Sequence, residues 1–451
     1  MANYNDKNKD TYCPFAWEHQ MIDSDGSYRL CCIAYDKIKD TDGTPFNVRS
    51  TTLEEVWNSE YMQTARTNML NGNKISDCRR CYKNEEINAY SYRQRTLAET
   101  SMGVSSYIKE ITDDDIVVQT APNYYDLRFG NLCNLKCVMC GPHYSSEHQA
   151  EFENFYNEIA EYPEDIKNNA LNSIGINPNT EAGNEWLETL PVYGGDKLYD
   201  WADSTDIFDK IITAVSKNTT KIIYLTGGEP TIVEGNFRML KTLVDNEHCN
   251  HITVIINTNC TNLNTNFYNI LYKFKKVLLN VSIDGVGETI EYIRYPSKWE
   301  QIDKNLNKIV NDINEKELTR FQISFASVVQ LLNAFNLEEL VKYYLELKSK
   351  SNYPDNITIV PTILEGPQWY DITNINRFTR DKINHTLQNY RGKDQSLDMW
   401  LNSIYKCMTN PTPVNHSLNI TSAIARHTYY KKYRKIEKYN NWFYGIIEQV
   451  I

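Results

Sequence analysis

Three cysteines lie within eight residues in the stretch CNLKCVMC, at Cys133, Cys137 and Cys140. Thiolates bind soft metals, and a purely structural metal site normally fills its coordination sphere with protein ligands. Three thiolates can hold three corners of a [4Fe–4S] cube and leave its fourth iron without a protein ligand. The alternatives are a zinc ion completed from elsewhere, or buried thiols without metal. Since zinc sites usually draw on paired Cys-x2-Cys or Cys/His sets, the spacing favours the cluster.

A second candidate site is the stretch LTGGEPTI, which contains Gly227, Gly228, Glu229 and Pro230. The two glycines allow the backbone to come close to a ligand. The carboxylate of Glu229 can accept hydrogen bonds from an ammonium group. By itself this motif is a weak signal.

The elements that would position these motifs are short β-rich runs alternating with amphipathic helices. The strands that we predict are 124–129, 221–226, 251–257, 276–283, 321–328 and 356–362. Several are apolar throughout, as is typical of strands buried on both faces of a parallel sheet. The clearest helix follows Asn336, where Asn336 and Glu339 resemble a capping box. The alternation predicts a parallel α/β sheet, open or curled as a barrel.

The two motifs follow the first and second predicted strands, and loops at the carboxyl ends of parallel strands carry ligand sites. We expect four parts: a Cys-rich domain at 1–85, a helical connector at 86–120, the sheet at 121–365, and a helical C-terminal region at 366–451. The interval 141–220 is too long for a simple crossover, so it predicts a helical insertion, with Phe152, Phe155 and Ile159 on one helix face.

Together these features resemble the radical S-adenosylmethionine (SAM) enzymes, over about residues 120–365. Their hallmarks are Cys-x3-Cys-x2-Cys after the first strand and GGEP after the second, on a partial (βα)6 TIM-like barrel. The resemblance implies that Cys133, Cys137 and Cys140 hold a [4Fe–4S] cluster. The amine and carboxylate of SAM would then bind the open iron, with Gly227, Gly228, Glu229 and Pro230 around the amine.

Later signatures extend the resemblance. INTNCTNL places Asn257 and Asn259 toward the cofactor, VSIDG places Ser282 as a ribose or carboxylate contact, and Arg294 resembles an arginine that pairs with the SAM carboxylate. Two positions depart from the family pattern. Met139 stands where an aromatic residue is common, and Cys260 stands where glycine is usual, which leaves a thiol near the expected active site.

The first 85 residues resemble a SPASM or twitch module, whose pattern is Cys-x9–15-Gly-x4-Cys followed by Cys-x2-Cys. We expect Gly26 to form a tight turn between two short strands. The resemblance implies a second, fully coordinated [4Fe–4S] cluster with the ligands Cys13, Cys31, Cys78 and Cys81. Four thiolates would also satisfy a structural zinc ion. Cys32 is left over. The module precedes the barrel here, whereas in most relatives it follows.

Composition limits the function. The formal net charge of −11 argues against a nucleic-acid substrate. The sequence YYKKYRKIEKY, residues 429–439, is expected to be the solvated face of a helix, with a binding patch as the alternative. No apolar run is long enough to span a bilayer and the N-terminus lacks a secretory apolar region, so we expect a cytoplasmic protein. In that compartment, eleven cysteines are more readily metal ligands or catalytic thiols than disulfides.

The resemblance implies an oxidoreductase or transferase that reductively cleaves SAM to a 5′-deoxyadenosyl radical, which abstracts a hydrogen atom. A one-electron donor such as flavodoxin or ferredoxin would supply the electron. We expect a peptide or protein side chain as substrate, because SPASM and twitch modules mostly occur in such enzymes, although no leader-binding domain is obvious at the start of the chain. The alternatives are a dehydrogenase or epimerase of a small metabolite, sugar or nucleotide, and a non-catalytic iron–sulfur or zinc protein.

Overall fold

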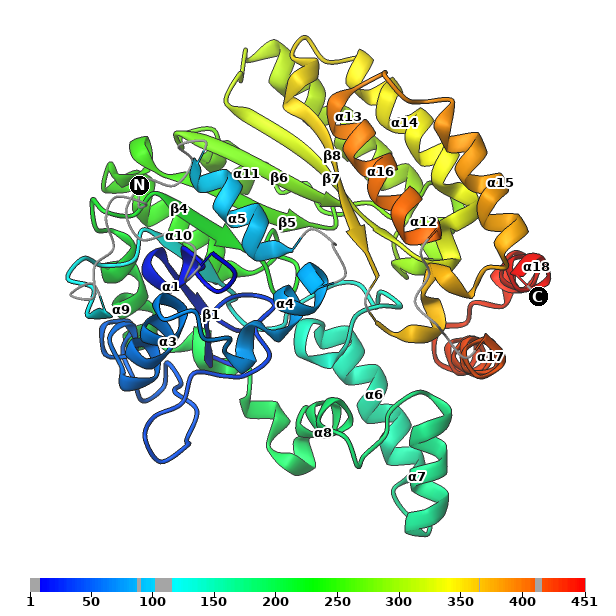
Figure 1. Ribbon diagram of the computed structural model, residues 1–451, viewed down its shortest axis with the longest axis horizontal. Coiled ribbons are helices and arrows are strands. Elements are labelled where there is room, and N and C mark those ends of the chain that lie inside the picture. The colour runs from blue at the N-terminus through cyan, green and yellow to red at the C-terminus, as the bar shows by residue number, and fades with distance from the viewer. Residues whose placement is uncertain (1–8, 87–90, 102–115, 365, 410–415, 451) are drawn as a thin grey trace. The chain divides into compact units, whose positions relative to one another are not determined.

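A computed structural model describes residues 9–86, 91–101, 116–364, 366–409 and 416–450 of the chain (Figure 1). Two compact units make up the structure. The first comprises Met1–Asn131, Lys197–Ile255 and Lys273–Lys275, and the second comprises Leu132–Asp196, Ile256–Tyr272 and Lys276–Ile451. The chain therefore passes between the units several times.

The first unit contains a sheet of strands in the order β2-β1-β3-β4. The strands are β1 (His19–Ile22), β2 (Tyr28–Arg29), β3 (Tyr124–Leu127) and β4 (Ile222–Leu225). β1 and β2 form an antiparallel hairpin, and β1 also pairs in parallel with β3, which pairs in parallel with β4. The predicted strands at 124–129 and 221–226 are confirmed. The hairpin of the Cys-rich segment continues their sheet, which the sequence pattern did not predict.

Seven α-helices surround these strands in the described part of the first unit. They are α1 (Phe15–Glu18), α2 (Leu53–Trp57), α3 (Glu60–Leu70), α4 (Arg79–Glu86), α5 (Tyr92–Ser101), α9 (Thr205–Val215) and α10 (Glu234–Asp245). The start of α2 is a capping box, in which the Thr52 hydroxyl accepts from the Glu55 backbone and the Glu55 carboxylate accepts from Thr52 N. On α9, Phe208, Ile211 and Val215 are buried, as an amphipathic helix against a sheet requires.

The second unit contains the parallel strands β6 (Lys276–Ser282), β7 (Phe321–Val329) and β8 (Ile357–Ile363). β5 (Thr253–Thr258) begins in the first unit and ends in the second. The predictions at 251–257, 276–283, 321–328 and 356–362 are thereby confirmed. With β3 and β4, these strands alternate with helices as the partial (βα)6 barrel predicts, and the fold is a mixed α/β fold with a parallel sheet.

The helices of the second unit fall into three groups along the chain. Those between strands are α11 (Thr265–Leu271), α12 (Glu288–Ile293), α13 (Trp299–Glu315) and α14 (Leu337–Ser349); the insertion adds α6 (Ser146–Ile159), α7 (Glu164–Ser173) and α8 (Glu181–Glu188); the C-terminal region adds α15 (Arg377–Gln388), α16 (Gln395–Thr409), α17 (His416–Arg434) and α18 (Asn440–Val450). Figure 1 shows α16 alongside β8. On α6, Phe152, Phe155 and Ile159 are all buried, as predicted.

The predicted capping box at Asn336 is wrong. A 3-10 helix, Leu331–Asn336, runs directly into α14, so Asn336 is not in the extended conformation that an N-cap needs. Its side chain instead accepts a hydrogen bond of 2.7 Å from Val286 N, in the loop after β6. The residue thus joins two loops at the carboxyl ends of β6 and β7.

No helix in the described ranges is both long and apolar enough to cross a membrane.

Candidate functional site

The cysteine loop, residues 133–140, belongs to the second unit and is fixed by its own backbone. Lys136 N donates to Tyr295 O at 2.6 Å, and Val138 N donates to Ile293 O at 2.8 Å. These bonds attach the loop to the carboxyl end of α12. Cys140 N donates to Cys137 O at 3.0 Å, which makes a turn between the second and third cysteines. The loop geometry is therefore defined without any ligand.

The first turn of α6 holds the other side of this loop. Ser145 Oγ donates to Leu135 O at 2.7 Å, and Ser146 Oγ accepts from Cys133 N at 3.2 Å. His148 is buried and bonds Cys137 O through Nε2 at 2.7 Å. Since a carbonyl only accepts, Nε2 carries the proton, and burial lowers the pKa of His148 to about 3. His148 is thus a neutral packing residue.

Cys137 is buried and Cys140 is partly buried, so their thiols need a nearby cation to ionise. Burial raises the pKa of Cys137, and it raises that of Cys140 to about 12, with the nearby Cys137 sulfur adding to the shift. Thiolates are the form that binds metal, so a buried set of this kind is completed by a cationic metal group. Three cysteines on one loop that is held by its own backbone bonds are the donor set that a [4Fe–4S] cube with one open iron would use.

A buried ion pair contacts one of these sulfurs. Arg294 Nε lies 2.7 Å from Asp284 Oδ2, and Arg294 Nη1 donates to Cys137 Sγ at 3.7 Å. Asp284 comes from the SIDG stretch after β6, and Arg294 directly follows α12. The sequence pointed to Arg294 as a partner of the SAM carboxylate but gave no role to Asp284.

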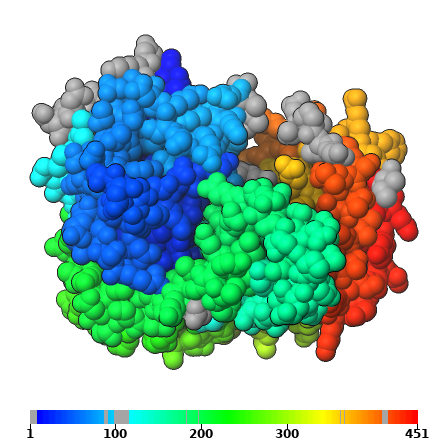
Figure 2. Space-filling view, turned by 90° about the horizontal axis from the view of Figure 1, so that it is seen from below, coloured from blue at the N-terminus to red at the C-terminus, as the bar shows by residue number. Residues whose placement is uncertain are grey.

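A second buried ion pair holds the backbone of the loop. Arg434, at the end of α17, binds Glu151 of α6 through Nε and Nη2, both at 2.9 Å from a carboxylate oxygen. Its Nη1 donates to Lys136 O at 2.7 Å. The side chains of Arg434 and Glu151 are 1% and 2% exposed. Figure 2 shows the insertion and the C-terminal helices side by side, coloured cyan-green and red.

The expectation of a solvated basic face at 429–439 is therefore wrong for Arg434. It holds for Lys432 and Lys438, whose side chains are 61% and 58% exposed. The difference is one of helix phase: Arg434 faces α6 and the cysteine loop, where a buried carboxylate and a carbonyl satisfy it.

Asn259, predicted to face the cofactor, is joined to the cysteine loop by side-chain amides. Asn259 Nδ2 donates to Asn134 Oδ1 at 2.9 Å, and Asn134 Nδ2 donates to Thr261 Oγ1 at 2.8 Å. Asn259 Oδ1 in turn accepts from Thr261 Oγ1 at 2.6 Å. Asn134 directly follows the first cysteine, and sequence reasoning missed it because an isolated asparagine carries no signal.

Two other predicted cofactor contacts lie on the partly exposed face of their strands. Asn257 Oδ1 accepts from Asn280 Nδ2 at 2.9 Å, and Ser282 follows Asn280 on the same face of β6. Cys260 is fully buried and has a φ of +56°, the left-handed conformation that explains the glycine found there in related sequences. Its carbonyl accepts from Asn305 Nδ2 at 2.8 Å.

The GGEP stretch follows β4 in the first unit, and Gly227 is required there for two reasons. Its φ is +108°, and a Cβ would lie 3.1 Å from Arg128 Cβ and 3.2 Å from Gly130 O. Glu229 is 1% exposed, and its Oε1 accepts from Thr231 N at 3.2 Å and from Thr231 Oγ1 at 2.6 Å. The turn is thus closely packed on the backbone that follows β3.

We expect Gly227→Ala to lower the free energy of unfolding by about 1–3 kcal/mol, because it forces a side chain into a conformation that only glycine adopts easily. Chemical denaturation measures the effect. The matched control is Gly235→Ala in α10, where a Cβ would lie at an ordinary 3.4 Å from Phe129 and the φ is not left-handed. Equal stability of the two variants would contradict the requirement for Gly227.

The N-terminal cysteines form a separate cluster within the first unit. The pKa of Cys31 is raised by burial and then by the nearby sulfurs of Cys32, Cys78 and Cys13. The pKa of Cys78 is raised by burial and then by Cys13 and Cys81. Since such effects act over short distances, the four predicted ligands lie together.

Gly26 makes the predicted turn that closes this cluster. It has a φ of +81°, its N donates to Asp23 O at 2.9 Å, and a Cβ would lie 2.9 Å from Val48 Cγ2. Cys32 lies beside this cluster, since its sulfur also raises the pKa of Cys31. After burial, its pKa is shifted mainly by Asp126 and Arg128, so its thiol lies toward β3.

Within the described ranges, no three His, Cys, Asp or Glu side chains converge so that a single metal ion could bind them.

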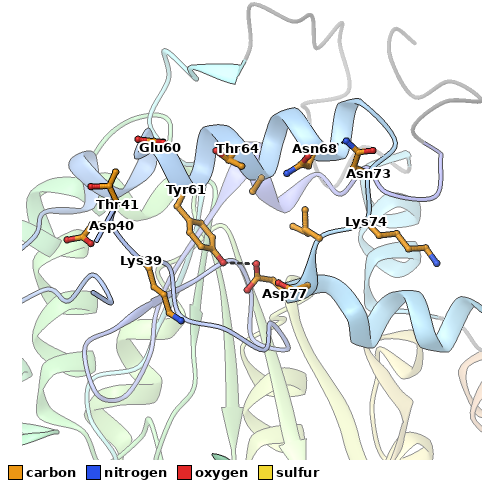
Figure 3. Close-up of a pocket in the computed structure, with 13 residues that line it drawn as sticks. Lys39, Asp40, Thr41, Glu60, Tyr61, Thr64, Asn68, Asn73, Lys74 and Asp77 are labelled. Carbon is orange, nitrogen blue, oxygen red and sulfur yellow. Dashed lines mark hydrogen bonds between the residues drawn. The ribbon is translucent and has the colours of Figure 1, made fainter. Parts of the chain in front are cut away.

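A cavity of about 440 Å³ adjoins the N-terminal cysteines in the first unit (Figure 3). It lies between one face of α3, the loop Lys39–Thr41 and the segment Asn73–Asp77, which ends directly before Cys78. Tyr61 donates to Asp77 Oδ2 at 2.6 Å inside it. Its lining includes three carboxylates and two lysines, and one of these, Lys74, is paired with Glu86. No motif in the sequence indicates this acidic cavity.

Comparison with known proteins gives two family matches. Residues 13–82 match the SPASM iron–sulfur cluster-binding domain, and residues 127–319 match the radical SAM superfamily. None of the curated proteins matches the chain by sequence.

Among solved structures, SuiB from Streptococcus suis bound to S-adenosylmethionine is 12% identical, with 83% of this chain and 69% of that chain covered and a TM-score of 0.30. A second SuiB structure is 13% identical, covers 83% and 70%, and has a TM-score of 0.33. Scores this low carry no argument about this chain.

The two family matches coincide with the two cysteine clusters. The radical SAM domain implies a [4Fe–4S] cluster and SAM as cofactors, and the SPASM domain implies auxiliary iron–sulfur binding. The chain therefore carries a radical SAM domain with a SPASM domain ahead of it, and it is a radical SAM enzyme.

Proposed function

We propose that this radical SAM enzyme modifies a side chain of a peptide or protein. The observation that carries the proposal is the SPASM match at residues 13–82, since SPASM modules occur mostly in enzymes with such substrates. The acidic cavity beside Cys78 supports it, because a cavity with an excess of carboxylates suits the basic side chains common in peptides.

The residues divide into three roles in this proposal. Cys133, Cys137 and Cys140 hold the SAM cluster, and Cys13, Cys31, Cys78 and Cys81 hold one auxiliary cluster. Gly227, Gly228, Glu229 and Pro230, with Asn257, Asn259, Ser282 and Arg294, bind and orient SAM. When bound and reduced by one electron, SAM supplies a radical that takes hydrogen from an unactivated C–H bond.

The chain's own part is to hold these groups and limit water. The cysteine loop keeps its form through backbone bonds and two buried arginines, so little order needs to be created when the cluster binds. We further propose a flavodoxin or ferredoxin as electron donor and a reducing, cytoplasmic environment, which suits eleven cysteines that are not joined in disulfides.

The test is anaerobic reconstitution with iron, sulfide, dithionite and SAM, followed by mass spectrometry. We expect 5′-deoxyadenosine and, with the right peptide, a product altered at one side chain. Production of 5′-deoxyadenosine with turnover only of a small metabolite would overturn the peptide assignment. Absence of 5′-deoxyadenosine from an iron-loaded enzyme would overturn the catalytic one.

We expect Cys78→Ala to lose about half of the roughly eight irons that two cubes provide, since it removes a ligand of the auxiliary cluster. Some SAM cleavage remains, but product formation is lost. Cys249→Ala is the control, because Cys249 is also a buried cysteine of the first unit and lies outside both cysteine clusters. Iron analysis and the visible spectrum measure both variants. An equal iron content per chain in Cys78→Ala and in the control variant would contradict the assignment of Cys78 as a ligand.

A further inference from the structure

The ion pair between Asp284 and Arg294 is placed to act on the cluster through a sulfur. Asp284 is fully buried, and Arg294 and Cys137 are each 8% exposed. The guanidinium lies between the carboxylate, at 2.7 Å, and the Cys137 sulfur, at 3.7 Å. The positive member of the pair is therefore the one in contact with the sulfur.

Both members of the pair are held in place by the fold. Asp284 Oδ1 accepts from Val328 N of β7 at 2.8 Å, and its carbonyl accepts from Asn333 Nδ2 at 2.7 Å. Arg294 N donates to Ile290 O at 2.8 Å, which fixes the arginine at the end of α12. A guanidinium oriented in this way keeps its direction toward Cys137 without a bound ligand.

We propose that this pair sets the reduction potential of the cluster ligated by Cys137, with Arg294 raising the potential and Asp284 lowering it. The inference rests on the proposed role of Cys137 as a cluster ligand, in which its sulfur is an iron-bound thiolate. It adds a role to Arg294 that is distinct from pairing with the SAM carboxylate.

The physical reason is the charge that reduction adds. One-electron reduction makes the cluster more negative by one charge, and a buried cation with an N–H directed at a ligand sulfur stabilises that form. Asp284 opposes the effect from behind the guanidinium. Because the groups are buried, solvent and salt screen them weakly.

The test is a redox titration of the reconstituted enzyme without SAM, with dithionite and mediators, followed by electron paramagnetic resonance. Two clusters can give a signal, so the one to follow is the signal that changes when SAM is added after the titration. We expect Arg294→Gln to lower the potential and Asp284→Asn to raise it. The double variant Asp284→Asn/Arg294→Gln should return toward the unaltered value.

Lys298→Gln is the matched control for the loss of one positive charge. Lys298 lies four residues after Arg294, and its side chain is 61% exposed. We expect the reduction potential of the cluster to be unchanged in this variant. If the pair had a merely structural role, Arg294→Gln and Asp284→Asn would shift the reduction potential of the cluster in the same direction. That result would overturn the proposal. So would unchanged potentials accompanied by weaker SAM binding.

If Arg294→Gln does not retain iron, the Asp284→Asn variant and the charge-neutral double variant decide the question. Failure of this inference leaves the formation of 5′-deoxyadenosine by the unaltered enzyme intact. Failure of the proposed function appears as the absence of that product or as turnover of a small metabolite only, and the potentials remain measurable in both cases, so the two failures are distinguishable.

Discussion

Replacing Cys137 with alanine should abolish the formation of 5′-deoxyadenosine, with a loss of at least about 10³-fold set by the assay background. Cys137 lies in the middle of the cysteine loop and contacts Arg294 through its sulfur. A cube held by two thiolates instead of three is not retained, so iron should fall by about four per chain. Iron analysis and mass spectrometry of the reconstituted variant measure both effects.

Cys249→Ala is the control for this result, because Cys249 is also buried and lies outside both cysteine clusters. We expect it to keep its iron and its SAM cleavage. Cleavage by Cys137→Ala at the level of this control would refute the assignment of the loop as the cluster site, and with it the catalytic interpretation of the whole chain.

The second large effect is expected from Arg434→Met, which should lower the free energy of unfolding by about 3–5 kcal/mol. The substitution removes the main partner of the buried Glu151 carboxylate, which keeps only the longer contact with Lys136 Nζ at 3.5 Å. It also removes a hydrogen bond to Lys136 O in the cysteine loop. Denaturant unfolding measures the first effect. Faster loss of iron to a chelator measures the second.

Lys432→Met is the matched control, since it lies on the same helix and its pair with Glu158 is at the surface. An exposed pair contributes about 0–1 kcal/mol, so this variant should be near normal. The double variant Glu151→Met/Arg434→Met should recover much of the loss, because it removes both buried charges. Similar stability of Arg434→Met and Lys432→Met would contradict the role of Arg434.

The same pair predicts how stability depends on pH. Burial alone raises the pKa of Glu151, but the Arg434 charge and its hydrogen bonds more than offset this, and the folded-state pKa is lowered. A lowered pKa contributes stability above the unfolded-state value, and this contribution is lost as the pH falls through the folded-state value. The difference between the unaltered protein and Arg434→Met should therefore shrink in acid.

Much of the fold could be predicted because its signals are local. All six predicted strands occur, within one or two residues at most ends, since runs of β-branched and aromatic residues between turns are sufficient to mark them. The turn at Gly26 was also predictable, because a positive φ strongly favours glycine. By contrast, the pairing of β1 with β3 joins segments about a hundred residues apart, and periodicity carries no information about such pairings.

The candidate site divides in the same way. The cysteine spacing and GGEP were enough to predict the chemistry, because each is a short stretch whose residues act together. Only the tertiary structure placed Arg434 against the cysteine loop, Asp284 behind Arg294, and Asn134 beside Asn259. The partners in these pairs are 10 to 298 positions apart in the sequence. Each side chain is held by a hydrogen bond or ion pair to a partner that no local sequence pattern identifies.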